Sequence, residues 1–84
     1  MKYHIEFTHQ SLKDLKKITP KLREKVKSLC ENILQETPYE GKKLMRELEG
    51  SFSLRISYKD RLVYSVDDKK KIVYVERCRT HYGE

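Results

Sequence analysis

The chain has 84 residues, of which 37% are hydrophobic and 38% are charged, and its formal net charge is +6. A chain this short folds as one domain, residues 1–84. It buries only about 60–65% of its unfolded surface, which excludes a deep pocket within a large scaffold. A small basic domain commonly binds a polyanion, and nucleic acid is the first candidate. A charged surface that only keeps the protein soluble is the alternative, and the net charge fits both.

The two cysteines, Cys30 and Cys78, form no CxxC pair and no zinc-binding spacing with histidines. Each lies in an apolar run, which favours buried free thiols and a reducing cytosol. The residues after Met1 are polar, without the apolar run of a signal peptide or a membrane-spanning helix. The sequence therefore predicts a cytoplasmic protein that contacts no membrane and uses no metal or other cofactor.

The N-terminal part of the chain is typical of one strand and two helices. Alternation from Tyr3 to Phe7 predicts the strand. Thr8 can cap the first helix, and Thr19 and Pro20 end it and begin the second, so we expect a helical hairpin. The apolar residues at helical spacing are Leu12, Leu15 and Ile18 in the first helix and Leu22, Val26, Leu29, Cys30 and Ile33 in the second.

The C-terminal part predicts a loop from Thr37 to Gly50 and then three strands, over residues 51–56, 61–66 and 72–78. The last strand is apolar on both faces, which favours a central position in the sheet. The order β-α-α-β-β-β predicts an α+β fold in which a helical hairpin packs on one face of a largely antiparallel four-stranded sheet. Arg55 alternates with Leu54 and Ile56, so we expect it on the opposite, partly open face.

Chemically useful side chains concentrate in the last thirty residues. Arg55, Arg61 and Arg79 lie on or beside neighbouring strands, and His81 and Tyr82 follow the last strand. If the strands pair in chain order, these residues gather on one side of the sheet. Arginines hold phosphates and stabilise the charge of a pentavalent transition state, and a histidine can move a proton. RNA supplies its own 2′-hydroxyl nucleophile, so this set could cleave it without a metal.

The same residues also have purely structural interpretations. Arg61 could be a surface charge, and a C-terminal His-Tyr pair could be a frayed end. Tyr64 and Tyr74 fit the sheet core better than a base-stacking platform. The lysines of the first helix fit a solvated face; they are Lys13, Lys16 and Lys17.

Three segments resemble the RelE/ParE toxin superfamily, and most closely its YoeB branch. They are Leu54-Arg55-Ile56, Arg61-Leu62-Val63-Tyr64 and Cys78-Arg79-Thr80-His81-Tyr82, and the run from Thr37 to Lys42 is also similar. The resemblance covers nearly the whole chain. It implies a RelE-like fold and the toxin of a type II toxin–antitoxin system. Such a toxin is an endonuclease that cuts mRNA in the A site of the 70S ribosome by 2′-hydroxyl attack, which inhibits translation. It also implies a cognate acidic antitoxin as partner.

Carried over by position, the resemblance implies catalytic roles for Arg61, which would steady the scissile phosphate, and for His81 and Tyr82. The branch has a glutamate general base in the loop after the second helix, and this chain is shorter there. Without a gap Lys42 falls at that position, and Glu47 follows, so the base is either His81 or this loop glutamate. The remaining basic residues assigned to RNA and phosphate binding are Arg55, Arg79, Lys42, Lys43 and Arg46.

Two other functions fit the same sequence. ParE-like members of the superfamily inhibit gyrase without cutting RNA, and a plain basic module could bind RNA without chemistry. The pair His81-Tyr82 beside Arg79 favours the nuclease, because ParE-like tails generally lack it. A short acidic protein encoded next to this one would favour either toxin over the third function.

Overall fold

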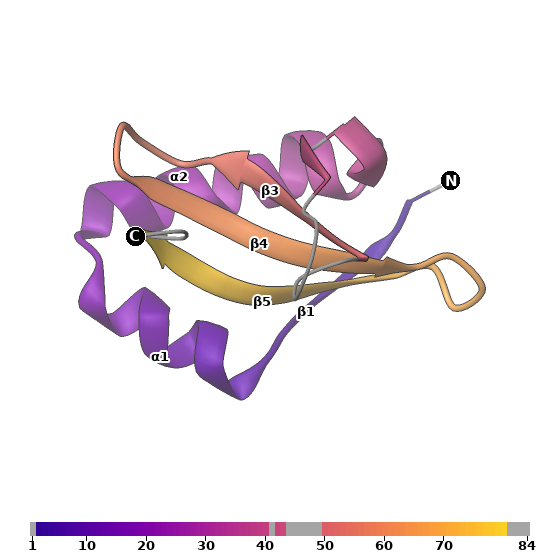
Figure 1. Ribbon diagram of the computed structural model, residues 1–84, viewed down its shortest axis with the longest axis horizontal. Helices are drawn as coiled ribbons and strands as arrows, with labels where there is room; N and C mark the ends of the chain where they lie inside the picture. The colour runs from indigo at the N-terminus through magenta and orange to yellow at the C-terminus, as the bar shows by residue number, and fades with distance from the viewer. Residues whose placement is uncertain (1, 41, 44–49, 81–84) are drawn as a thin grey trace.

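A strand leads into two consecutive helices, and the other strands follow after two short helical turns (Figure 1). The structure is a computed structural model, and it describes residues 2–40, 42–43 and 50–80. The elements in chain order are β1 (His4–Phe7), α1 (His9–Lys17), α2 (Pro20–Leu29), the π-helical turn η1 (Cys30–Leu34), the 3-10 turn η2 (Pro38–Glu40), β2 (Lys42–Lys43), β3 (Ser51–Arg55), β4 (Asp60–Asp67) and β5 (Ile72–Thr80).

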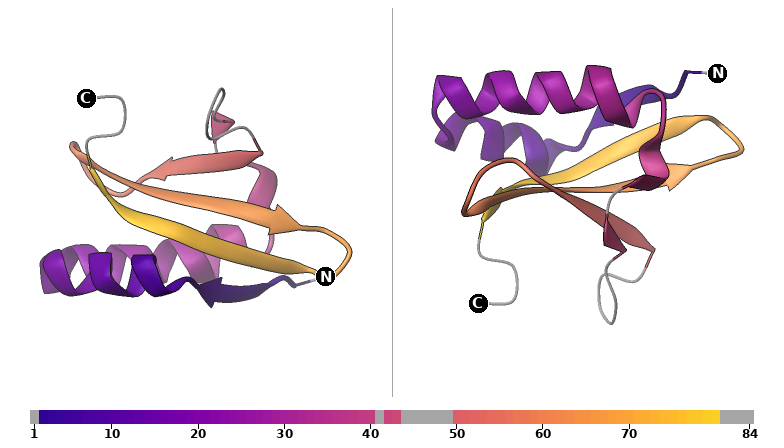
Figure 2. Two further views of the ribbon diagram at one scale, coloured as in Figure 1. Left: turned by 60° about the horizontal axis from the view of Figure 1, so that its bottom comes forward. Right: turned by 90° about the horizontal axis from the view of Figure 1, so that it is seen from above.

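The strands form one mixed sheet in the order β1-β5-β4-β3-β2. β1 pairs with β5 in parallel, and the other neighbouring strands are antiparallel. Both helices lie on one side of this sheet (Figure 2). The predicted α+β fold is therefore confirmed, and β5 lies inside the sheet as expected. The two-residue strand β2 adds to the four predicted strands and lies within the segment that was expected to be a loop.

The helical hairpin forms where the local sequence predicts it. The hydroxyl oxygens of Thr8 and Thr19 each accept the backbone N–H of the residue three positions later, at 3.2 Å, which satisfies free amides at both helix starts. Arg23 of α2 donates through Nη1 to the carbonyl oxygens of Leu15 and Ile18, at 2.9 and 2.8 Å. These bonds satisfy carbonyls at the end of α1 and fix α2 against it.

The core lies between the helices and the sheet. Leu12, predicted to belong to it, is instead 47% exposed, whereas Ser11 and Asp14 of α1 are buried. These two polar residues can face inward because each has a hydrogen-bond partner there. Ser11 donates to the carbonyl oxygen of Thr8, and Asp14 accepts the Cys78 amide of β5. The buried hydrophobic cluster consists of Val26, Cys30, Leu34, Phe52, Ile56, Leu62, Tyr64, Val73, Val75 and Cys78.

The face of the sheet opposite the helices is here called the outer face. Arg55 is exposed on it, as predicted. Ser51 and Ser53 alternate along β3 with the same spacing as Arg55, so they lie on the outer face too. Val63 of β4 pairs with Ser53 and shares that face, and all three residues are buried. The outer face is thus open at the Arg55 end of β3 and covered toward the start of that strand.

Candidate nucleic-acid interface

Three arginines share one cross-strand row on the outer face. Arg55 of β3 lies opposite Arg61 of β4, and Arg61 lies opposite Arg79 of β5. Residues paired in this way share one face of a sheet, so the Arg55 and Arg61 side chains point to the same side. Arg55 is exposed and Arg61 is half-buried. The structure thus brings together the three arginines that the sequence singled out, and we refer to them as the arginine row.

The arginine row is unfavourable for the sheet by itself. Like charges directly opposite each other on neighbouring strands destabilise the pair. Within the described part of the chain, neither Arg55 nor Arg61 forms an ion pair. Three adjacent cations on one sheet are therefore an arrangement that an anion would stabilise, and the arginine guanidinium matches the geometry of phosphate and of carboxylate.

The hairpin between β3 and β4 fixes the register of this row. Ser57 Oγ donates to Asp60 Oδ2 at 2.7 Å, and the Asp60 amide donates back to Ser57 Oγ at 3.2 Å. The Ile56 amide also donates to the Asp60 carbonyl oxygen at 2.8 Å. The turn is closed by short-range bonds on both sides, so Arg55 and Arg61 are held opposite each other.

The loop residues assigned to RNA binding are only partly described. The backbones of Lys42 and Lys43 form β2 and lie opposite Ser53 and Phe52 of β3. Lys42 therefore lies in the cross-strand row of Ser53, two residues along β3 from Arg55. The other predicted site residues lie outside the described residues, and their roles stay predictions; they are Arg46, Glu47, His81 and Tyr82.

The structure adds an acid–base pair that the sequence analysis missed. Asp14 Oδ2 of α1 accepts from Arg77 Nε at 2.8 Å and from the Cys78 amide at 3.1 Å, and its side chain is fully buried. Burial opposes ionisation, but hydrogen bonds from Arg77, the Cys78 amide and Gln10 outweigh it and hold the pKa of Asp14 below its usual value of 3.8. The sequence did hold a sign of this pair. Asp14 is the acidic residue on the inward side of a lysine-rich helix, and an acid in that position requires a buried partner.

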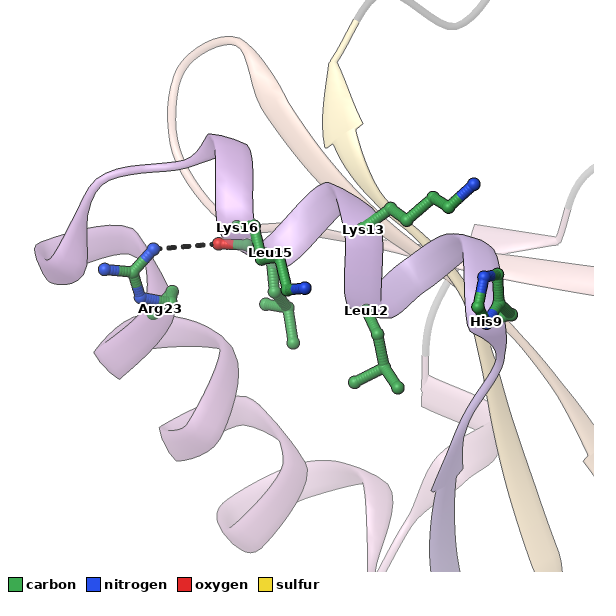
Figure 3. Close-up of a pocket in the computed structure, with 6 residues that line it drawn as sticks. All are labelled: His9, Leu12, Lys13, Leu15, Lys16 and Arg23. Atoms are coloured by element: carbon green, nitrogen blue, oxygen red, sulfur yellow. Dashed lines mark hydrogen bonds between the residues drawn. The ribbon is translucent and has the colours of Figure 1, made fainter.

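The helical layer carries a separate surface cleft of about 700 Å³ beside α1 (Figure 3). The Arg23 guanidinium at its rim is already bonded to backbone carbonyls of α1. The cleft lies on the helices, whereas the arginine row lies on the opposite face of the sheet, so the two are distinct. The cleft is lined by His9, Leu12, Lys13, Leu15, Lys16 and Arg23.

The described residues contain no group of three or more His, Cys, Asp or Glu side chains placed to hold a metal ion. No helix among them is long and apolar enough to cross a membrane.

Two helices on one face of a mixed sheet, with a basic row on the other face, define a RelE-like toxin fold. The crystal structure of the toxin–antitoxin complex RelBE2 from Mycobacterium tuberculosis matches with a TM-score of 0.86 and 33% identity, over 96% of this chain and 100% of that chain. The YoeB–YefM complex from Staphylococcus aureus matches with a TM-score of 0.78 and 31% identity, over 98% and 100%.

Sequence comparison identifies the branch. The family model described as YoeB-like toxin of bacterial type II toxin–antitoxin system matches residues 7–82. Toxin RelG of Mycobacterium tuberculosis is 36% identical over 78 residues, which are 92% of this chain and 88% of that protein. The chain belongs to the YoeB-like toxin family, and the resemblance stated from its motifs is confirmed.

Proposed function

We propose that this toxin is a ribosome-dependent endonuclease that cuts mRNA in the A site and thereby inhibits translation. Membership of the YoeB-like family makes it a toxin of a type II system. The observation that supports nuclease chemistry is the arginine row, where Arg61 lies between Arg55 and Arg79 on three adjacent strands. Neighbouring strands are about 4.8 Å apart, so the row extends over roughly 10 Å, long enough to contact more than one phosphate of a single strand.

The chemistry assigns a role to each predicted residue. The 2′-hydroxyl oxygen of one nucleotide attacks the adjacent phosphorus and loses its proton to a general base. A 2′,3′-cyclic phosphate forms, and the 5′-oxygen leaves with a proton. Arg61 stabilises the charge that builds on the phosphate oxygens, and Arg55 and Arg79 hold the strand. His81 or Glu47 serves as the base, and Tyr82 stacks on a base or donates a hydrogen bond.

The same row suits an inhibitor. Several solved relatives are complexes of toxin with antitoxin, among them the intact RelBE complex of Escherichia coli, which is 27% identical with a TM-score of 0.80. We propose that a cognate acidic antitoxin binds this chain and covers the arginine row, because carboxylates compete for a site built to hold phosphates. The toxin is then active only when the antitoxin is removed.

Primer extension on ribosome-bound mRNA in a translating extract tests the proposal. The wild-type protein should truncate the message within the A-site codon and leave free mRNA intact. Arg61→Ala should cut far more slowly, whereas Lys69→Ala, which removes one exposed positive charge from the β4–β5 turn, should cut like the wild type. Intact mRNA together with blocked gyrase supercoiling would support the ParE-like function instead. Binding to RNA without cutting would support a non-catalytic module.

A further inference from the structure

The end of β5 that carries Arg79 has a strand partner on only one side. β1 pairs with β5 from His4 opposite Ile72 to Phe7 opposite Val75, whereas β5 continues to Thr80. Within the described chain, the residues of β5 after Val75 have no β1 partner, and those from Arg77 to Thr80 pair with β4 alone. Backbone amides and carbonyls on such a free edge need other partners if the strand is to stay in place.

Helix α1 supplies these partners where β1 ends. The Thr8 amide donates to the Val75 carbonyl oxygen at 3.1 Å, and Thr8 Oγ1 donates to the Glu76 carbonyl oxygen at 3.2 Å. Asp14, further along α1, accepts the Cys78 amide at 3.1 Å. A carboxylate thus takes the position that a strand carbonyl would hold, one residue before Arg79.

Several contacts fix this carboxylate in turn. Arg77 Nε lies 2.8 Å from Asp14 Oδ2, and Gln10 Nε2 donates to Asp14 Oδ1 at 3.2 Å. The Asp14 side chain is fully buried, and Cys78 is 0% exposed. A buried carboxylate with this many donors has little freedom, so it can hold a backbone amide more precisely than a surface side chain can.

We propose that Asp14 is a positioning residue for the arginine row, because its bond to the Cys78 amide holds the adjacent Arg79 opposite Arg61. The inference rests on the proposed function, since the position of Arg79 affects the reaction only if the row binds the RNA. Asp14 does not reach the outer face as a ligand. It acts through the backbone of β5.

Amide hydrogen exchange tests whether Asp14 fixes the end of β5, and the measurement needs no nuclease activity. In Asp14→Ala the amide of Cys78 should exchange at least about tenfold faster than in the wild type, because its hydrogen-bond acceptor is gone, and the neighbouring Arg79 amide should exchange faster as the end of β5 loosens. Asp14→Asn should restore most of the protection, since its amide oxygen can accept the same N–H. Ser11→Ala is the matched control, because Ser11 is also buried on α1 but donates to Thr8 within the helix. Unchanged exchange at Cys78 and Arg79 in Asp14→Ala would overturn the proposal.

A double-mutant cycle with Arg79→Ala tests the link to the reaction. Asp14→Ala should lower kcat for ribosome-bound mRNA by about 10- to 100-fold, the effect of misplacing a group by about 1 Å. In the Arg79→Ala background the same change should cost no more than about twofold, because the group it positions is absent. Equal losses in both backgrounds would show a general effect on the fold and contradict the positioning role.

The outcomes separate this inference from the proposed function. If Asp14→Ala does not fold, the cycle is run with Asp14→Asn, whose smaller loss should also vanish in the Arg79→Ala background. If the wild type cuts no RNA while exchange rises at Cys78, the nuclease proposal fails and the hold on β5 stands. If the wild type cuts RNA and Asp14→Ala cuts equally well, only the positioning role fails.

Discussion

Arg61 lies at the centre of the arginine row, with Arg55 opposite it on β3 and Arg79 opposite it on β5. It is half-buried at the start of β4, directly after the hairpin turn. Its side chain is absent from the buried hydrophobic cluster. The same residue therefore has a large expected role in holding phosphate and a small one in holding the fold together.

Arg61→Ala should lower the rate of mRNA cleavage by about 10²–10³-fold, the usual cost of losing one transition-state donor. Its free energy of unfolding should be unchanged or slightly higher, because removing the middle cation relieves repulsion along the row. Single-turnover cleavage and urea unfolding measure the two effects. Arg61→Lys keeps the charge without the bidentate fork and should recover only part of the rate. A large loss of stability in Arg61→Ala would mean that the residue is structural.

Both cysteines have a raised pKa, whereas reactive thiols have a lowered one. Burial raises the pKa of Cys30 to about 11 and that of Cys78 to about 12. A raised thiol pKa means less thiolate at a given pH, so alkylation at pH 8 should be at least about 100-fold slower in the native protein than in urea. Iodoacetamide labelling followed by mass spectrometry gives both rates. Rapid labelling of Cys78 in the native state would show that the strand opens beside Arg79.

At the scale of the elements, local signals were enough to predict the helices. Thr8 and Thr19 each cap a helix through a bond to the third residue beyond, so the information lies within four residues of sequence. The arginine row also follows from simple parity once β3, β4 and β5 pair in chain order. The row was predictable because two short turns leave little choice of register.

Other features depend on residues far apart in the chain. The contact between Asp14 and Cys78 joins α1 to the last strand across 64 positions. The bulge in the β4–β5 pairing places Glu76 out of step between Val75 and Arg77, and no composition signal marks it. The loop that contains β2 carries several basic residues with no periodic pattern. The sequence therefore predicted a basic loop but not that Lys42 and Lys43 pair with β3.

The contact between α1 and β5 should be sensitive to acid. The lowered pKa of Asp14 means that its ionised form stabilises the folded state. That contribution is fully present above the usual pKa of 3.8 and is lost as pH falls through the lower folded-state pKa. Urea unfolding from pH 7 to pH 2 should find the wild type about 2 kcal/mol more stable than Asp14→Asn above about pH 5, the scale of a hydrogen bond to a charged group. The difference should shrink below about pH 4.

Asp68→Asn is the control for this measurement. The pKa of Asp68 is also lowered, first by the hydrogen bond from Tyr3, but that carboxyl is exposed. Water competes for an exposed charge, so its removal should change the acid dependence much less. Equal acid profiles for the wild type and Asp14→Asn would contradict a folded-state role for the Asp14 charge.

At the scale of the whole molecule, both helices cover one side of the sheet (Figure 2), and the arginine row lies on the other side. Both sides depend on the sheet, because β4 places Leu62 and Tyr64 in the core and Arg61 opposite Arg55 on the outer face. With a net charge of +6, the protein attracts any polyanion from a distance, whereas the arginine row places three arginines in cross-strand register at one point of the described sheet. Long-range attraction by the net charge and binding at the arginine row should therefore respond differently to salt and to substitution of single residues.

Single-stranded RNA and the cognate antitoxin should compete for the arginine row and weaken together as salt rises. Each phosphate contact on a single strand contributes about 0.7 to the slope of log affinity against log salt. Arg61→Ala should therefore lower the slope for a short RNA by about 0.7, and Lys69→Ala should change it less, because its charge lies in the distant β4–β5 turn. Fluorescence anisotropy of labelled RNA over a range of salt concentrations gives the slopes. Adding the cognate acidic antitoxin should release the RNA from the wild type. RNA and antitoxin bound at the same time, or antitoxin affinity that is flat with salt, would place the antitoxin elsewhere on the molecule.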